Sequence, residues 1–242
     1  MASPHSTPLA PIGGIDPKPK NYVIIVAAGS GKRMNTSVPK QFLLLNGRPV
    51  LMYTVAAFHN SDAHPKIIVV LPEDYHAYWE DLCAEYNFFI PQKLIKGGET
   101  RFHSVKNGLN AIPNDADMIA VHDAVRPLVS KKIIDESFRY AEKHGNAITA
   151  LKSRDSIRQI NGTNSVPLDR DKIYLVQTPQ TFQSALLKNA YSQNYSANFT
   201  DDASVVEQAG SHINFIAGNY RNIKITFPED IAIAESLMVH GL

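Results

Sequence analysis

Three cationic residues follow a glycine loop near the start of the chain, and this combination suits a polyphosphate ligand. The apolar run 23–26 leads into Ala27-Ala28-Gly29-Ser30-Gly31, after which come Lys32, Arg33 and Lys40. A loop with so little side-chain bulk lets backbone N–H groups approach an anion closely. Arginine then offers a planar fork of donors and lysine a point charge. We therefore expect a phosphate-binding loop directly after the first strand.

Two well-known phosphate loops do not fit this stretch. A dinucleotide-binding loop needs a third glycine where this chain has Met34, and a P-loop needs serine or threonine where Lys32 is followed by Arg33. A strand and turn with solvated cations is the alternative without a function. The order A-A-G-x-G-x-R-M, followed by P-K-Q, resembles instead the signature of sugar-phosphate and alditol-phosphate nucleotidyltransferases.

Short apolar runs alternate with helical patterns along the rest of the chain. This alternation predicts an α/β fold with a doubly wound, mostly parallel sheet, in which ligands bind beyond the carboxyl ends of the strands. The polar motifs 97–101 and 122–127 follow two of the expected strands and so belong at that edge. We expect strands at 21–26, 67–71, 93–95, 118–121, 147–151, 176–180, 213–216 and 222–225, and helices after Pro49, at 74–86, at 101–111, after Ser130, at 184–191, from Thr200 to Glu207 and after Thr226.

Three helix starts carry their own signals. Ser130 and Thr200 are expected to cap the helices that follow them. Thr226 to Glu229 reads as a capping box with Pro228 in the first turn. The last helix carries Ile231, Ile233, Ala234 and Leu237 and is expected to close the core.

Residues 152–172 interrupt the alternation and predict a projecting β-hairpin arm. Asn161-Gly162 is a strong turn signal between two short segments. The segment has few large apolar residues, and an isolated hairpin is marginally stable in water. We expect the arm to be stabilised against another surface, plausibly a second subunit; a mobile surface hairpin is the alternative.

Length and composition indicate one domain over residues 21–242. Residues 1–20 contain five prolines and predict a disordered extension. The formal net charge is +1, so no overall field favours nucleic acid or a membrane surface. Cys83 is the single cysteine; its neighbours have helical spacing, which favours a core position over a nucleophile. No stretch has the length of a membrane span, and a reducing cytoplasm is the expected location.

Together the motifs resemble the family of 2-C-methyl-D-erythritol 4-phosphate cytidylyltransferases. The resemblance covers about residues 22–237 in nine ordered pieces. It implies a Rossmann-like nucleotidyltransferase fold, CTP and methylerythritol phosphate as substrates, Mg²⁺ held largely by the triphosphate, and a homodimer whose arm enters the partner's site. The pieces are 27–34, 39–41, 97–101 with Ser104, 122–127, 154–156, 169–170, 177–180, 200–204 and 222–226.

The resemblance also implies a role for each matching residue. Arg33 and Lys40 would stabilise charge at the α-phosphorus, Lys224 would bridge the two substrates, and Arg170 would orient the alditol phosphate. The CTP site would comprise Ala27, Ala28, Gly29, Gly31, Gly98, Glu99, Ser104 and Asp123, with Asp123 also near the metal. The alditol-phosphate pocket would comprise Arg126, Ser156, Arg170, Thr178 and Thr200.

Some positions leave alternatives open. Glu99 stands where the family often has aspartate, and Ser156 where it often has threonine. Val125 also occurs in relatives that use ribitol 5-phosphate, although those more often begin the loop with Ala-Gly-Gly. Gly98, Thr200 and Asp123 could serve only as a turn, a cap and a strand end. A catalytically silent nucleotide-binding relative is the alternative from another class.

Overall fold

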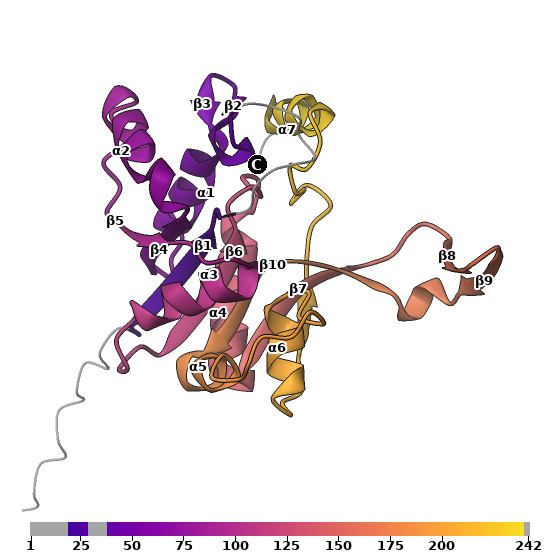
Figure 1. Cartoon of the computed structure of the whole chain (residues 1–242). Helices are drawn as coiled ribbons and strands as arrows, with labels where there is room; N and C mark the ends of the chain where they lie inside the picture. Colours follow the sequence, from indigo (N-terminus) through magenta and orange to yellow (C-terminus); the bar gives the residue numbers. More distant parts are fainter. Residues whose placement is uncertain (1–18, 29–37, 240–242) are drawn as a thin grey trace, which may run out of the picture.

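A seven-stranded sheet forms the centre of the computed structural model, which describes residues 19–28 and 38–239 (Figure 1). The strand order is β11-β7-β10-β6-β1-β4-β5. Within the described part of this seven-stranded sheet, β10 alone runs antiparallel to both of its neighbours. The mostly parallel α/β sheet predicted from the sequence is thus confirmed. The strands are β1 (Asn21–Val26), β4 (Lys66–Leu71), β5 (Gln92–Lys96), β6 (Met118–Asp123), β7 (Asn146–Lys152), β10 (Tyr174–Gln183) and β11 (Phe215–Ala217).

Helices cover both faces of this sheet, which explains why the interior strand β1 is apolar after Asn21. In β1, Val23 and Ile25 pack into one buried cluster, and Tyr22 and Ile24 into the other. The first cluster includes residues of α1 (Val50–His59), α2 (His76–Glu85) and α4 (Lys131–His144). The second includes residues of α3 (Arg101–Asn110), α5 (Ser184–Ala190) and α6 (Asp202–Gln208).

A third, smaller cluster lies where α7 (Glu229–Val239) packs near the short hairpin of β2 (Leu44–Leu45) and β3 (Arg48–Pro49). It buries Ile225 and Ala234 together with Leu45 and Val125. The expected strand at 222–225 is wrong, since this segment has no strand partner. Ile225 instead donates its N–H to the carbonyl of Val125 and buries its side chain, so its apolarity reflects packing against a loop.

The last helix also begins and packs differently from the prediction. Thr226 forms no capping box with Glu229: the carboxylate of Asp230 accepts from the N–H groups of Thr226 and Phe227, and the Thr226 hydroxyl donates to the carbonyl of Lys224. Ala234 is buried as expected, but Ile233 is 48% exposed.

The other two predicted caps had different outcomes. Ser130 caps α4 as predicted, accepting from the N–H of Ile133. The predicted cap at Thr200 is wrong, because Asp201 occupies that position and exchanges hydrogen bonds with Ser204. Asp201 has the stronger capping side chain of two adjacent candidates.

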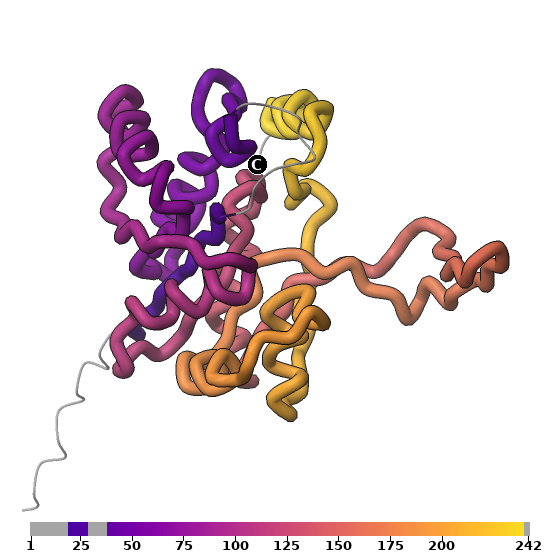
Figure 2. The backbone as a smooth tube through the Cα atoms, viewed as in Figure 1, coloured from indigo at the N-terminus to yellow at the C-terminus, as the bar shows by residue number. Residues whose placement is uncertain are grey.

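The predicted hairpin forms an arm that projects from the body where β7 ends and β10 begins (Figures 1 and 2). It consists of β8 (Ile157–Asn161) and β9 (Asn164–Leu168), followed by the 3₁₀ turn η4 (Arg170–Lys172). Gly162 in the turn has a φ of +61°, which glycine adopts without strain. The two strands pair with each other only, in a sheet of their own.

Most of the predicted N-terminal extension, residues 1–18, lies outside the described residues. Over the part of the chain that the structure describes, none of the helices has both the length and the apolarity to cross a bilayer.

Candidate active site

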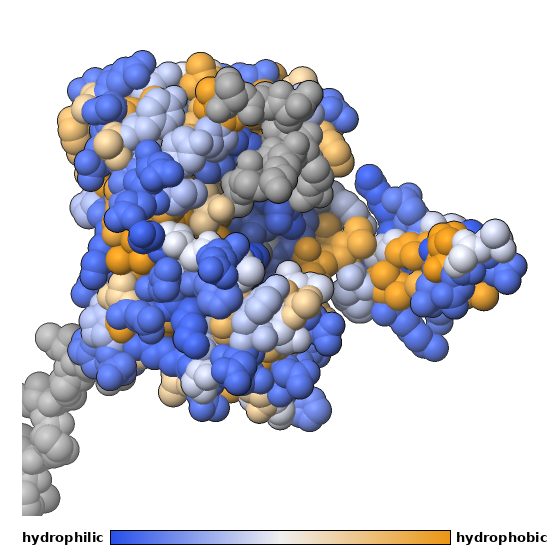
Figure 3. Space-filling model, in the orientation of Figure 1, coloured by the Kyte–Doolittle hydropathy of each residue, from blue (hydrophilic) through white to orange (hydrophobic). Residues whose placement is uncertain are grey.

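The carboxyl ends of β1, β5 and β6 meet around a cavity of about 350 Å³. Figure 3 shows this face of the molecule hollowed, with hydrophilic side chains inside the hollow. Eight of the predicted site residues contribute to it, namely Ala27, Ala28, Lys40, Gly98, Glu99, Ser104, Asp123 and Lys224. The last of these, Lys224, comes from the segment before α7.

Backbone geometry dominates one end of this cavity. Gly98 leaves no room for a side chain, because a Cβ there would lie 2.4 Å from the Cβ of His103. Its N–H donates to the hydroxyl of Ser104 at 3.0 Å, and that hydroxyl donates to the carbonyl of Thr100 at 2.9 Å. Ser104 therefore fixes the turn that precedes α3.

Hydrogen bonds fix the backbone of the small residues that follow β1. The buried amide of Gln41 donates to the carbonyl of Ala27 at 2.7 Å, and the N–H of Ala27 donates to the carbonyl of Val70. Lys40, which begins the 3₁₀ turn η2 (Lys40–Phe42), donates to the carbonyl of Ile225 at 3.4 Å. Sequence reasoning gave Gln41 no role, although the Pro-Lys-Gln order marked its position.

A second cavity of about 310 Å³ adjoins the first. Three residues line both of them: Arg101, Asp123 and Lys224. Three residues predicted for the alditol-phosphate pocket lie in the second cavity, namely Arg126, Thr178 and Thr200. The described residues predicted for CTP thus line the first cavity, and Arg126, Thr178 and Thr200, predicted for the alditol phosphate, line the second.

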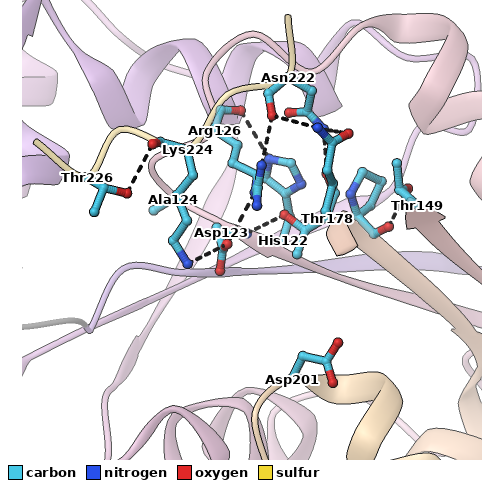
Figure 4. A network of polar contacts seen from close by, with 12 residues as sticks. His122, Asp123, Ala124, Arg126, Thr149, Thr178, Asp201, Asn222, Lys224 and Thr226 are labelled. Atoms are coloured by element: carbon cyan, nitrogen blue, oxygen red, sulfur yellow. Dashed lines mark hydrogen bonds and ion pairs between the residues drawn. The ribbon is translucent and has the colours of Figure 1, made fainter. Parts of the chain in front are cut away.

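Asp123 lies at the boundary between the two cavities and faces three cations, of which Figure 4 shows Lys224 and Arg126. Its carboxylate is 2.9 Å from Lys224 Nζ, 3.3 Å from Arg126 Nε and 3.8 Å from Arg101 Nε. Burial alone would raise the pKa of Asp123, but Arg101, Lys224 and Arg126 together hold this pKa well below its usual range. The carboxylate is therefore charged, and it holds these cations at the boundary.

Arg101 is a residue that the sequence motif contained but to which no role was given. Its guanidinium makes two hydrogen bonds to the buried carboxylate of Asp202, of 2.9 and 2.6 Å. The Tyr191 hydroxyl donates to the same carboxylate at 2.6 Å. This fixed pair joins the start of α3 to the start of α6, beside the shared wall of the two cavities.

His122 is buried and neutral, although it precedes Asp123 in a functional motif. Desolvation lowers its pKa to about 3. Its ring packs edge-on against Phe58, and Nε2 lies 3.2 Å from the carbonyl of Arg126, where a neutral ring donates a proton. It therefore supports the loop 123–127 and does not face either cavity.

The remaining predicted residues are not placed in either cavity. Ser156 and Arg170 belong to the arm and line neither space within this chain. Gly29, Gly31 and Arg33 lie outside the described residues.

An α/β sheet whose strand ends carry two joined cavities, with cations at their boundary, is the framework of a nucleotidyltransferase. A family model described as 2-C-methyl-D-erythritol 4-phosphate cytidylyltransferase, IspD, matches residues 22–240. The chain belongs to this family, whose pathway is non-mevalonate isoprenoid synthesis.

Individual relatives agree with the family model. A protein of this name from Azobacteroides pseudotrichonymphae is 49% identical over 90% of this chain and 99% of its own length. One from Phocaeicola vulgatus is 46% identical, with the same two shares of length covered. The crystal structure of the Thermus thermophilus protein has a TM-score of 0.73 and 31% identity, covering 90% of this chain and 98% of its own.

Proposed function

We propose that the two joined cavities hold CTP and 2-C-methyl-D-erythritol 4-phosphate, and that the cytidylyl group passes between them at Asp123 and Lys224. The observation that carries this proposal is the boundary itself: Lys224 and Arg101 line both spaces and face one carboxylate. A transfer reaction requires its two substrates to meet at such a point.

The first cavity is assigned to CTP. Ala27, Ala28, Gly98, Glu99 and Ser104 surround it, and their backbone groups and short side chains suit a base, ribose and triphosphate. Gly29 and Gly31 complete this set by family resemblance. The second cavity, with Arg126, Thr178 and Thr200, is assigned to the alditol phosphate, because a buried guanidinium and hydroxyls recognise a phosphorylated polyol.

The reaction needs charge neutralisation more than proton transfer. A phosphate oxygen of the acceptor forms a bond to the α-phosphorus of CTP, and the bond from that phosphorus to the bridging oxygen breaks, releasing pyrophosphate. The attacking oxygen is already an anion, so no general base is required. We assign Lys40, Arg33 and Lys224 to stabilising the charge that accumulates at the α-phosphorus.

Magnesium is the metal that we assign to this site. The described residues hold no group of three or more His, Cys, Asp or Glu side chains suited to a metal. Nevertheless, the Oδ1 oxygen of Asp123 lies 3.8 Å from its ion-pair partner, Nε of Arg101. One carboxylate fits Mg²⁺, which keeps most of its waters and binds chiefly to substrate phosphates. Asp123 would hold the ion, which would neutralise charge on the triphosphate.

A homodimer would bring Ser156 and Arg170 to the site. These residues lie on the arm, which projects away from the cavities of its own chain (Figure 1). The arm and its base expose Ile160, Val166 and Leu175, which a partner would cover. Light scattering at micromolar concentration should give the mass of two chains; the mass of one chain would contradict the dimer.

The test is pyrophosphate release with CTP and Mg²⁺, comparing 2-C-methyl-D-erythritol 4-phosphate with ribitol 5-phosphate. Turnover with the first acceptor alone is expected. Turnover with ribitol 5-phosphate alone would keep the mechanism and change the substrate. Tight CTP binding without pyrophosphate release from either acceptor would instead indicate a binding protein.

Lys40 offers a direct test of the mechanism. Lys40→Ala should fold normally, since the side chain is partly exposed, and should lose at least about a hundredfold in kcat because a charge at the α-phosphorus is missing. Lys188→Ala is the control, since Lys188 binds the carbonyl groups of Ile112 and Pro113, away from both cavities. Near-normal turnover of Lys40→Ala would contradict the assignment.

A further inference from the structure

Gln177 has a side-chain amide whose hydrogen bonds all go to one loop. Nε2 donates to the carbonyl groups of Asn219 and Asn222, at 3.0 and 3.3 Å. Oε1 accepts from the N–H of Asn219 at 3.3 Å and from Nδ2 of Asn222 at 3.4 Å. An amide has two donors and two acceptor positions, so these contacts use its full capacity. Gln177 also borders the second cavity, but no hydrogen-bonding position remains for a ligand there.

The loop that Gln177 holds lies between β11 and α7 and carries Lys224. Because residues 222–225 have no strand partner, their backbone must be fixed by individual contacts. On one side Asn222, fully buried, donates from Nδ2 to the carbonyl of Thr178 at 2.9 Å. On the other side Ile225 donates its N–H to Val125 at 2.9 Å. Lys224 stands between these two anchors.

Arg126 depends on the same point. Its Nη1 donates to the carbonyl of Asn222 at 2.8 Å, the carbonyl that also accepts from Gln177. Figure 4 shows Arg126 beside Asn222, and Lys224 reaching Asp123 from the same segment. Both long side chains are flexible in isolation, so the position of each charge depends on the backbone of the loop.

The side-chain amide of Gln177 is also packed closely against Gly218. Gly218 begins the loop, and a Cβ at this position would lie 2.5 Å from Oε1 of Gln177. A methyl group there would have to displace the amide. Gly218 lines neither cavity, so it offers a way to disturb Gln177 from outside the site.

We propose that Gln177 is a positioning residue that acts through Asn222 to set Lys224 and Arg126 on the acceptor side of the site. The proposal rests on the proposed function, in which Arg126 contacts the acceptor and Lys224 stabilises the charge that accumulates at the α-phosphorus. Of this network only Lys224 lines the first cavity, where it stands at the point of transfer, whereas Gln177, Asn222 and Arg126 do not line that cavity. Loss of Gln177 should therefore impair use of the acceptor and leave CTP binding nearly unchanged.

The test compares Gln177→Met with Gln183→Met in pyrophosphate-release kinetics. Methionine has a similar length and no amide, and Gln183 is an exposed residue at the other end of the same strand. In Gln177→Met we expect kcat/KM for the acceptor to fall about tenfold or more, while KM for CTP changes less than about twofold. Gln183→Met should match the wild type. Gly218→Ala should show the same split as Gln177→Met and replaces it if that variant does not fold.

The outcomes separate the inference from the function on which it rests. Lys224→Ala and the wild type are measured alongside. If Lys224→Ala loses activity while Gln177→Met and Gly218→Ala behave as the wild type, the inference is overturned and the function stands. Equal losses for acceptor and CTP, together with a lowered thermal midpoint, would mean general destabilisation and would also overturn it. If the wild type turned over neither acceptor, both the inference and the proposed function would be contradicted.

Discussion

The carboxylate of Asp202 is fully buried, and its partners explain why it is tolerated. Arg101 and the hydroxyl of Tyr191 bind it, with no exposed surface on the carboxylate side chain. Burial alone would lower the pKa of Arg101, but Asp202 and Asp123 raise that pKa above its usual value. Arg101 is thus charged, and because its guanidinium makes two hydrogen bonds to the buried Asp202, each side chain would be costly without the other.

Asp202→Asn should therefore destabilise the protein strongly. The substitution keeps the shape but leaves the Arg101 guanidinium without its charged partner, at an expected cost of about 3 kcal/mol in the free energy of unfolding. Urea unfolding followed by circular dichroism measures this. Asp62→Asn removes an ion pair with Lys131 in which the Asp62 side chain is 74% exposed, and should leave the free energy of unfolding nearly unchanged. Similar losses for the two variants would contradict the role of burial.

Cys83 should be a slow thiol in the folded protein. Desolvation raises its pKa to about 11, which lowers the thiolate fraction below that pH. Because the thiolate is the reactive form, alkylation by iodoacetamide at pH 8 should be about a hundredfold slower in the folded chain than in urea. The folded rate should still be rising at pH 10. Mass spectrometry of timed samples measures it, and a rate that levels off near pH 8.5 would contradict this environment.

Sequence reasoning predicted most elements well and failed where an element depends on a distant neighbour. The strands of the central sheet are continuously apolar because helices cover both faces, so their pattern is visible locally. The antiparallel direction of β10 could not be read in the same way, since it depends on how the chain returns from the arm. Residues 222–225 look like a strand because Ile225 is buried, yet their backbone is bonded to a loop and to side chains such as those of Gln177, Arg126 and Lys40.

Prediction of the site residues also failed where a residue depends on a distant neighbour. Lys224 could be predicted because a cation between two isoleucines requires a partner. Asp202 and Gln177 could not, because each acts on residues remote in sequence: Asp202 on Arg101, 101 positions away, and Gln177 on Asn222, 45 positions away. Motifs mark the residues that face a ligand more clearly than those that hold them in place.

The start of α6 allows a test at the level of an element. Asp201 caps this helix and also accepts from the amide of Gln180 at 2.9 Å. Asp201→Ala should cost about 1–2 kcal/mol in the free energy of unfolding, whereas Thr200→Ala, one position outside the helix, should cost less than about 0.5 kcal/mol. Chemical denaturation of both variants provides the comparison. The reverse order of stability would restore Thr200 as the cap.

At the level of the whole molecule, the first cavity lies at the strand ends of the body, and the arm projects away from the body without lining it. Figure 3 shows hydrophobic side chains gathered on the arm and at its base. Ile160 and Val166 are 67% and 52% exposed. Such exposure on a slender hairpin would favour aggregation in a single chain, whereas a two-fold dimer would bury it symmetrically.

A two-fold arrangement in which each arm serves the partner's cavities predicts that two inactive variants restore each other. Arg170→Ala damages the arm, and Lys224→Ala damages the body of the chain. In a mixed dimer, the intact body of the first variant would receive the intact arm of the second. Random exchange should then restore activity to about a quarter of the wild-type value per site, since half of the dimers are mixed and each has one intact site. Pyrophosphate release after unfolding and refolding the two variants together measures this.

Two body variants, Lys40→Ala and Lys224→Ala, are the control, because no exchange of arms can rebuild a site from them. Activity that stays at the sum of the separate variants would show that each arm serves its own chain.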